Sequence, residues 1–473
     1  MHTLTELRAG RLAGIRRLDL SCGLTEFPPE IFTLAGSLEI LNLSGNALDH
    51  LPDDLPRLHR LRVLFCSDNR FTELPDVLGR CAGLDMVGFK ANRIRHVPAA
   101  ALPSRLRWLI LTDNDIAELP DELGHRPRLQ KLMLAGNRLT QLPATLAGCT
   151  QLELLRISAN RLPTLPDGIA ALPRLAWLAQ AGNPFAAAHE ATARAAHPVP
   201  DVDWAELALG ERLGEGASGV IHRAQWRSGT QVRRDVAVKL FKGALTSDGL
   251  PQSEMAACLA AGTHPNLIGA VGRIAGHPDS AQGLLMPLVD PACRVLAGPP
   301  SLDSCTRDVY ATGTRFTPTV ALNIATGIAA AAAHLHARGI LHGDLYAHNI
   351  LWNDAGDALL GDFGAASFLD PDDRAMAEAL QRTEVRAFGC LLEELLAHAG
   401  HQAADDVHTA NADAIDTDHV HHVHQVDRAA LRAMSSLQAR CSSDDPRDRP
   451  LMADVHRELA RAATGTLHTP THR

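Results

Sequence analysis

The stretch LHGDLYAHNILWNDAGDALLGDFG, residues 341–364, brings hard oxygen donors together at two points of the chain. Asp344 and Asn349 lie five residues apart and offer a carboxylate and an amide oxygen, and Asp362 supplies a further carboxylate just before a Phe-Gly pair. Two short apolar runs between these points, separated by a polar turn, predict two strands. The strands would carry all three side chains to one edge of a small sheet, where they could hold a magnesium ion with a nucleotide.

A glycine-rich turn lies far upstream of this stretch. LGEGASGV, residues 213–220, places Gly214, Gly216 and Gly219 between two apolar runs, where the backbone can approach phosphate groups because no side chain intervenes. Dinucleotide-binding folds use a similar glycine pattern, but there it leads straight into a helix. Here two strand candidates follow instead, and the second contains VAVK, which ends at Lys239.

Lys239 needs a carboxylate to hold it, and a suitable one follows. Glu254 lies in a helical segment fifteen residues further on and ten residues ahead of the sequence HPNLI. The order of glycine loop, strand lysine, helix glutamate, HPN, HGD with its asparagine, and DFG resembles the protein-kinase pattern over roughly residues 207–462. RAFGCLLEELL from Arg386 and CSSDDPRDRP at 441–450 also resemble late features of that family.

This resemblance implies an α+β, two-lobed, protein-kinase-like domain that transfers the γ-phosphate of ATP to a protein hydroxyl, with serine or threonine as the expected acceptor. Asp344 would orient the hydroxyl proton, Lys239 held by Glu254 would contact the phosphates, and Asn349 with Asp362 would hold Mg²⁺. The implied nucleotide contacts are Gly214, Glu215, Gly216, Ala217, Ser218, Gly219, Val220, Ala237 and Lys239 in the small lobe and Met286, Leu288 and Val289 at the hinge.

The chain departs from the family pattern at several positions. Gly343 replaces the arginine that usually precedes the catalytic aspartate, which favours constitutive activity or control by another domain over control by loop phosphorylation. Tyr346 replaces a lysine that often steadies the γ-phosphate; tyrosine kinases also lack this lysine, so the type of acceptor hydroxyl stays open. Glu384 replaces the aspartate that opens the buried helix. The activation segment is short and lacks APE, so Arg449 is expected to lack its usual glutamate partner. His348 is an unusual neighbour for Asn349 and is interpreted as a packing residue.

These departures leave alternatives open. The first is an active protein kinase; the second is a pseudokinase scaffold that works through protein binding. A third is a phosphotransferase acting on a small molecule, because HGDL followed by asparagine also occurs in aminoglycoside-kinase-like proteins. The DPxxRP ending and the repeats described next count against the third.

The first part of the chain is periodic. Each unit reads LxxLxLxxNxLxxLPxxLxxL, as in LEILNLSGNALDHLPDDLPRL at 38–58, and this resembles the leucine-rich repeat. We expect an α/β solenoid of about eight repeats of 23 residues over residues 1–185, in which stacked copies share one core. The repeat leucine or isoleucine recurs at Ile15, Leu38, Leu61, Leu84, Leu106, Leu129, Leu152 and Leu175, and a structural asparagine recurs at Asn46, Asn69, Asn92, Asn114, Asn137, Asn160 and Asn183.

The variable strand positions of such a solenoid form its concave face. Here they include Phe65, Trp108, Met133 and Trp177, which are more apolar than a solvated face requires. Aromatic residues and methionine are enriched in interface cores, so this strip is a candidate surface for a protein substrate or regulator. The alternative is that a neighbouring domain folds back onto it.

Two other segments stand apart. Residues 186–206 are expected to form a helical cap and a short, stiff linker. Residues 399–427 are rich in histidine and aspartate and are interpreted as a disordered insertion, with a metal-binding or pH-sensitive loop as the alternative. The tail, residues 463–473, is expected to be disordered.

Composition limits the possible partners and compartment. The net charge of −9 argues against general binding to nucleic acid or to an acidic membrane, since both need a basic face. The nine cysteines form no CxxC pair and the first residues lack the apolar core of a signal peptide, so we expect reduced thiols in the cytoplasm, with export as an effector left open. The most apolar window, around 324–341, contains His334, His336 and Arg338, which predicts a helix of a folded domain and not a membrane span.

Overall fold

The computed structural model describes residues 2–196, 200–216, 218–227, 233–243, 245–246, 248–399 and 417–464. It divides into two compact units: one consists of Met1–Ala188 with Ser247–Leu250, and the other of His189–Thr246 with Pro251–Arg473. All nine cysteines are free thiols.

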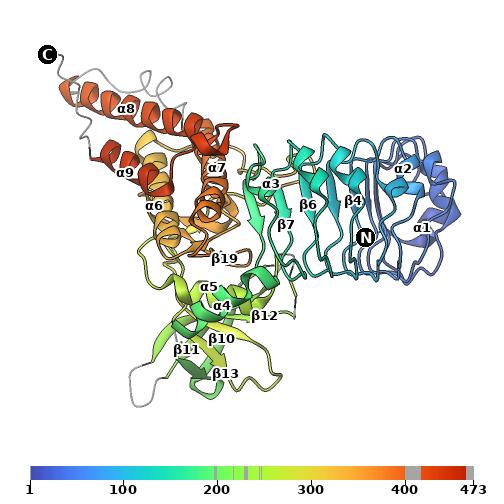
Figure 1. Ribbon diagram of the computed structural model, residues 1–473, viewed down its shortest axis with the longest axis horizontal. Coiled ribbons are helices and arrows are strands. Elements are labelled where there is room, and N and C mark those ends of the chain that lie inside the picture. Colours follow the sequence, from blue (N-terminus) through green and yellow to red (C-terminus); the bar gives the residue numbers. More distant parts are fainter. Residues whose placement is uncertain are drawn as a thin grey trace. The chain divides into compact units, whose positions relative to one another are not determined.

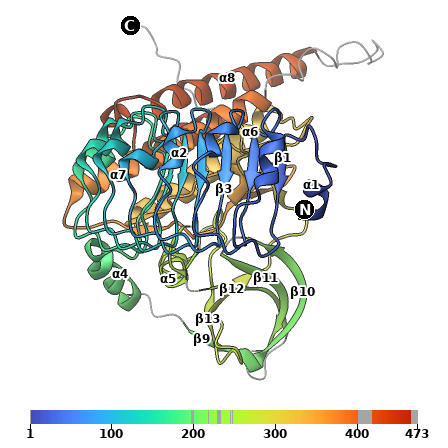
Figure 2. The same cartoon turned by 90° about the vertical axis from the view of Figure 1, so that its right-hand side faces the viewer.

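The first unit is a solenoid built on one parallel sheet. Its strands pair in chain order, each with the next (Figure 1, Figure 2). They are β1 (Arg17–Asp19), β2 (Ile40–Asn42), β3 (Val63–Phe65), β4 (Met86–Gly88), β5 (Trp108–Ile110), β6 (Lys131–Met133), β7 (Leu154–Arg156) and β8 (Trp177–Ala179). The predicted strand phase is therefore confirmed, and with it the leucine-rich-repeat architecture.

Short helical turns return the chain from each strand to the next. The α-helices among them are α1 (Leu4–Arg8), α2 (Val77–Arg80) and α3 (Asp167–Ala170), and single 3₁₀ turns occupy Pro29–Leu34, Leu55–Arg57, Ala99–Ala101, Asp121–His125 and Ala144–Gly148. Such short turns are not stable alone, so the unit depends on the leucines that point inward from neighbouring coils. From Leu38 to Leu175 the repeat leucines are buried, whereas Ile15 in the first coil is half-buried.

The repeated asparagines link adjacent coils. Asn137 is typical: its Nδ2 donates to the carbonyls of Leu111 and Leu134, both at 2.9 Å, and its Oδ1 accepts the N–H of Ile116 at 3.1 Å. These bonds satisfy backbone groups at the bend that would otherwise be buried without partners. The structural role predicted for the asparagines is confirmed.

The concave strip differs from the prediction at its C-terminal end. Phe65, Trp108 and Met133 are half-buried, but Trp177 is only 1% exposed. Near this end Asp248 forms an ion pair of 2.7 Å with Arg156, which is itself buried. The part of the strip that remains accessible is therefore the part around Phe65 and Trp108.

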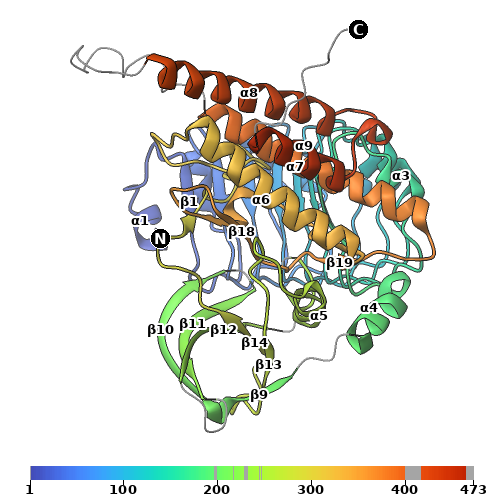
Figure 3. The ribbon, with the colours of Figure 1, turned by 90° about the vertical axis from the view of Figure 1, so that its left-hand side faces the viewer.

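The second unit contains a six-stranded sheet in the order β10-β11-β12-β14-β13-β9 (Figure 3). The strands are β9 (Asp201–Asp203), β10 (Leu207–Glu215), β11 (Gly219–Trp226), β12 (Arg234–Phe241), β13 (Gly272–Ala275) and β14 (Gly283–Pro287), and α5 (Pro251–Ala261) follows β12. Val202, Ala224, Val236, Val238, Ile274 and Leu285 form the core of this small lobe.

The segment expected to be cap and linker is more ordered than predicted. The helix α4 (Pro184–Ala196) occupies its first part, as expected for a cap. Its last part is not a free linker, because Asp201–Asp203 forms β9, which pairs in parallel with β13. Residues 197–199 lie outside the described residues.

The large lobe is mainly helical. The helix α6 (Pro318–Ala337) packs against α7 (Arg374–His398), α8 (Thr417–Cys441) and α9 (Met452–Ala463). Among the described residues α6 alone is long and apolar enough to cross a membrane, but 56% of its most apolar window is buried, as in the core helix of a folded domain.

Short strands complete this lobe. β15 (Arg294–Val295), β17 (Ile350–Trp352) and β18 (Ala358–Leu360) form a sheet, and β16 (Ile340–Leu341) pairs with β19 (Ser367–Phe368). The strand pair predicted in the sequence 341–364 is present as β17 and β18.

The histidine-rich segment is only partly described. His401 and His408 lie outside the described residues, as does most of the tail. The helix α8 begins at Thr417, inside the range expected to be a disordered insertion. From residue 417 onwards the chain is therefore helical, which differs from the disorder expected there.

Candidate active site

The two lobes bring a buried cation and two carboxylates together. Lys239 on β12 and Glu254 on α5, which are 7% and 3% exposed, form an ion pair. Lys239 Nζ also lies 3.6 Å from Asp362 Oδ1. Burial disfavours the charged ammonium, but Asp362 and Glu254 outweigh it and raise the pKa of Lys239 above its usual value. The ammonium is therefore charged and fixed between the lobes.

Asp362 has an unusual backbone conformation. Its φ is +55°, in the left-handed region that few residues other than glycine adopt. Its side chain is 47% exposed, and its Oδ1 accepts the N–H of Gly364 at 3.2 Å. Backbone strain of about 1–3 kcal/mol persists where the surrounding structure requires it, most often at functional sites.

Asp344 and Asn349 lie between β16 and β17, on the segment here called the catalytic loop after its predicted role, and they are joined directly. Asn349 Nδ2 donates to both the carbonyl oxygen and Oδ2 of Asp344, each at 2.9 Å. The carbonyl of Asn349 in turn accepts the N–H of Gly361, the residue before Asp362. These hydrogen bonds thus connect the three predicted oxygen donors, Asp344, Asn349 and Asp362, at one edge of the β17–β18 pair.

These donors suit Mg²⁺ only in the company of phosphate. Within the described part of the chain no group of three or more His, Cys, Asp or Glu side chains could hold a metal ion by itself. Mg²⁺ commonly binds through one or two carboxylates together with substrate phosphates and water. Asp362 and the Oδ1 atom of Asn349 fit that requirement.

Beneath the catalytic loop a buried glutamate holds its first residues. Glu384 on α7 is 3% exposed and accepts the N–H of Gly343 at 2.6 Å, and it pairs with His336 Nε2 at 2.7 Å. Burial alone would raise the pKa of Glu384, but the hydrogen bond and charge of His336, with His342, hold it below the usual value. Glu384 thus anchors the loop as a carboxylate, and the sequence pattern gave no sign that His336 takes part.

The glycine loop joins β10 to β11. Gly216 N donates to Gly219 O at 2.9 Å and closes the turn, and Lys242 Nζ bonds the carbonyl of Gly216 at 3.1 Å and forms an ion pair with Glu215. A Cβ at Gly214 or Gly216 would meet nothing within 4 Å, so open space lies where a phosphate group would approach. Ala217 lies outside the described residues.

Gly219 is required for a different reason. A Cβ there would lie 2.5 Å from the carbonyl oxygen of Leu240, closer than any real contact, so glycine is needed for the two strands to pair. Ser218 is buried beside it, and Val220 pairs with Leu240 across β11 and β12.

The predicted adenine-contacting residues lie along β12 and β14. Ala237 is buried and pairs with Met286, which is half-buried at the end of β14. Leu288 and Val289 follow directly and are half-buried. Their placement agrees with a hinge that leads from the small lobe into the large one.

A separate cavity of about 730 Å³ lies elsewhere in this unit. Its lining includes Met255, Leu259, Ile274, His277 and Gln282. None of the predicted site residues is among its lining residues, so it lies apart from the predicted nucleotide site.

The region after Asp362 is compact. β19 and the turn at Asp370 fill the short interval before α7 begins at Arg374. Asp370 also lies 3.3 Å from His189 of α4. The interval leaves little of the platform on which a kinase normally docks a protein substrate.

Arg449 is buried and bonds backbone carbonyls. It is 1% exposed, and its guanidinium donates to the carbonyls of Ser443 at 2.9 Å and Arg382 at 3.2 Å. Burial, with Arg386 nearby, lowers the pKa of Arg449 to about 10. Backbone carbonyls are thus among the partners of this buried guanidinium.

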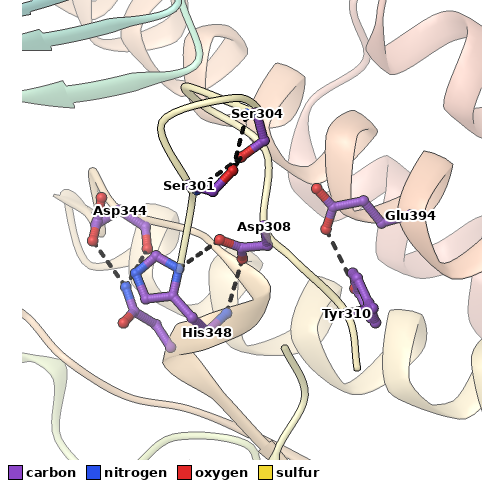
Figure 4. A network of polar contacts seen from close by, with 8 residues as sticks. Ser301, Ser304, Asp308, Tyr310, Asp344, His348 and Glu394 are labelled. Atoms are coloured by element: carbon purple, nitrogen blue, oxygen red, sulfur yellow. Dashed lines mark hydrogen bonds and ion pairs between the residues drawn. The ribbon is translucent and has the colours of Figure 1, made fainter. Parts of the chain in front are cut away.

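His348 has a defined partner that motif analysis missed. Its backbone N–H and its Nδ1 bond the two carboxylate oxygens of Asp308, at 2.9 and 2.7 Å (Figure 4). Asp308 lies in no recognised motif, so only the fold brings it to the catalytic loop.

Comparison with known proteins agrees with this geometry. Residues 207–386 match the family described as protein tyrosine and serine/threonine kinase, and residues 37–58, 104–162 and 127–185 match leucine-rich repeats.

Three curated relatives illustrate the kinase similarity. The chain is 28% identical over 180 residues to a probable serine/threonine-protein kinase, kinY, of Dictyostelium discoideum, over 36% of this chain and 30% of the relative. It is 28% identical over 180 residues to CBL-interacting protein kinase 22 of Oryza sativa subsp. japonica, over 35% and 37% of the two chains. It is 25% identical over 190 residues to the serine/threonine-protein kinase mos of Xenopus laevis, over 40% and 49%.

The match spans less than half the length of each of these relatives. The chain therefore joins a leucine-rich-repeat domain to a domain of the protein kinase family.

Proposed function

We propose that this protein is an ATP- and Mg²⁺-dependent protein kinase that phosphorylates serine or threonine, and that its repeats bind a protein substrate or regulator. The observation that carries the proposal is the meeting of Lys239 with Glu254 and Asp362 between the lobes. A scaffold that takes up no nucleotide would have no need to keep a buried cation aligned with two carboxylates, because such an arrangement is costly to desolvate.

Each residue has a distinct part in the proposed reaction. Lys239 binds the phosphates and is held in place by Glu254. Asp344, fixed by Asn349, accepts or orients the proton of the acceptor hydroxyl. Asn349 and Asp362 would hold Mg²⁺, which supplies charge neutralisation on the transferring oxygens when bound. The turn at Gly214 and Gly216 excludes water from the phosphates.

The proposed compartment is the cytoplasm. The free state of all nine thiols supports a reducing environment.

The half-buried Phe65, Trp108 and Met133 support a binding role for the repeats. The Phe65 and Trp108 rings meet edge-to-face with their centroids 6.5 Å apart, and Lys131 Nζ lies 4.2 Å from the Trp108 ring centroid.

The activity is tested with purified full-length protein, labelled ATP, Mg²⁺ and histone as a generic acceptor. Wild type should transfer label, and Asp344→Ala should lose transfer by about 100-fold or more. Asp354→Ala is the matched control, because Asp354 lies in the same stretch but is 88% exposed and forms only a surface ion pair with Arg294. Equal labelling by wild type and Asp344→Ala would favour the pseudokinase scaffold.

The role of the repeats is tested in a cell lysate supplied with labelled ATP. Substrates recruited by the concave strip should lose label with Trp108→Ala, whereas labelling of histone should stay unchanged. Identical lysate labelling by wild type and variant would reject a binding role for this strip.

A further inference from the structure

A closed loop that belongs to no kinase motif reaches the catalytic loop. The N–H and C=O groups of Gly298 and Val309 bond each other at 2.9 and 3.0 Å, so residues 298–309 form a loop whose two ends are tied together. Ser301 and Ser304 bond each other within it. The side chain of Asp308, near its end, is 0% exposed and faces the catalytic loop (Figure 4).

Both carboxylate oxygens of Asp308 bond the same residue, His348. Oδ2 accepts the backbone N–H of His348 at 2.9 Å, and Oδ1 bonds His348 Nδ1 at 2.7 Å. A buried carboxylate with two such bonds fixes the positions of both the backbone N–H and the ring of its partner. The ring also lies against Tyr346, with ring centroids 4.9 Å apart.

The residue held in this way is next to the catalytic machinery. His348 directly precedes Asn349, whose amide bonds Asp344 at 2.9 Å. A continuous path of contacts therefore runs from Asp308 through His348 and Asn349 to the residue that would receive the hydroxyl proton. Small displacements at such a position are costly, because the reacting atoms must meet at near-contact distance.

The helix α7 holds both ends of the catalytic loop. Glu384 accepts the N–H of Gly343 at its beginning. Ten residues further along the same helix, Glu394 accepts a hydrogen bond from the Tyr310 hydroxyl at 3.3 Å and from the backbone of Asp308. The loop of residues 298–309, whose Asp308 bonds His348, is thus itself fixed to the core of the lobe.

These contacts of Asp308 order the catalytic loop in place of the arginine that Gly343 replaces. Gly343 provides no cation that could engage a phosphorylated activation segment, so order in the catalytic loop must come from elsewhere. We propose that Asp308 is a positioning residue for phosphoryl transfer: it fixes His348, and through it the geometry of Asn349 and Asp344, without any phosphorylation of the activation segment. The inference rests on the proposed kinase function.

The first test measures kcat and KM with the full chain, ATP, Mg²⁺ and histone. Asp308→Ala should lower kcat by about 10- to 100-fold and leave the KM for ATP within about twofold, because Lys239, Glu254 and the glycine loop are untouched. Asp308→Asn keeps an oxygen that can accept the backbone N–H of His348, so it should restore part of kcat. Asp303→Asn is the control, since Asp303 is exposed on the same loop.

A double-variant cycle separates positioning from general support of the fold. If Asp308 acts through His348, Asp308→Ala should cause a smaller fold-loss of kcat in a His348→Ala background than in wild type. Equal losses in the two backgrounds, an equal loss with Asp303→Asn, or a rise of the KM for ATP in proportion to the loss of kcat would each overturn the inference.

Hydrogen exchange of peptides covering residues 342–352 gives a readout that needs no activity. Asp308→Ala should speed exchange there, and Asp303→Asn should not. Unchanged exchange in Asp308→Ala, with an active wild type, would overturn the positioning role and leave the kinase proposal standing. An inactive wild type, with exchange that still depends on Asp308, would overturn the proposed function while supporting the ordering of the loop.

Discussion

Lys239 Nζ lies 3.6 Å from Asp362 Oδ1, although the two residues come from different lobes of the second unit. The ammonium also pairs with Glu254, so one cation is shared by two carboxylates. A site for a triphosphate with Mg²⁺ would require such a relationship on the protein side.

Removing the cation should destabilise the fold as well as end catalysis. Lys239→Ala leaves Glu254 buried without its ion-pair partner, and the loss of one member of a buried pair costs about 3 kcal/mol or more. Lys242→Ala removes a lysine whose ion-pair side chains are 40% and 33% exposed, so its stability should change by less than about 1 kcal/mol. Urea unfolding monitored by circular dichroism compares the two variants, and similar midpoints for both would contradict the buried pair.

Two glycines of the same turn should respond differently to a methyl group. In Gly219→Ala the added Cβ would lie 2.5 Å from the Leu240 carbonyl oxygen, so the strands must shift and stability should fall by about 1–3 kcal/mol. In Gly216→Ala the Cβ enters open space, so stability should hold while affinity for ATP falls. Thermal unfolding with a fluorescent ATP analogue separates these effects. A stable Gly219→Ala protein would show that the strands do not pair as described.

The half-buried Glu394 should make stability fall as pH rises. Burial, with the charge of Asp308, raises the pKa of Glu394 from its usual value of 4.5 to about 8. Between those values the folded protein keeps a proton that the unfolded chain releases, so stability is greatest below about pH 4.5 and falls until about pH 8.

Comparison of the Glu394→Gln variant with wild type isolates the pH-dependent contribution of Glu394 to stability. Its free energy of unfolding, minus that of wild type, should increase between pH 5 and pH 8, with a slope of at most about 1.4 kcal/mol per pH unit. Glu393→Gln, the neighbour on the same helix, serves as the control. A difference that does not vary with pH would mean that Glu394 is ionised in the folded state.

Phosphatase treatment should leave the activity intact. Gly343 lacks the side chain that would read a phosphorylated activation segment, and Glu384 and Asp308 hold the catalytic loop instead. We expect kcat of phosphatase-treated protein within about twofold of the untreated protein. A loss of about tenfold or more, reversed by preincubation with ATP, would show that phosphorylation controls the enzyme after all.

Much of the fold could be predicted because its signals are local and repeated. A leucine period sets which residues face inward in each coil, and the asparagines fall at the bend where an amide must satisfy neighbouring backbone groups. The strands β17 and β18 likewise follow from apolar runs and a turn. Five side chains were recognisable because their order along the chain resembles the protein-kinase pattern: Lys239, Glu254, Asp344, Asn349 and Asp362.

Other features depended on distant parts of the chain. The burial of Trp177, the entry of Asp201–Asp203 into the small-lobe sheet and the start of α8 at Thr417 could not be predicted from local patterns, because a neighbouring segment decides each one. The carbonyl partners of Arg449 are of the same kind.

The sequence by itself determined the two domain types and which side chains are proposed to act in phosphoryl transfer, since periodicity and motif spacing are properties of the chain. Only the tertiary structure decided that Asp308 forms hydrogen bonds with His348 and that His336 pairs with Glu384. The physical reason is that a buried carboxylate takes whichever N–H groups the packed fold places beside it, and a linear pattern does not contain that choice.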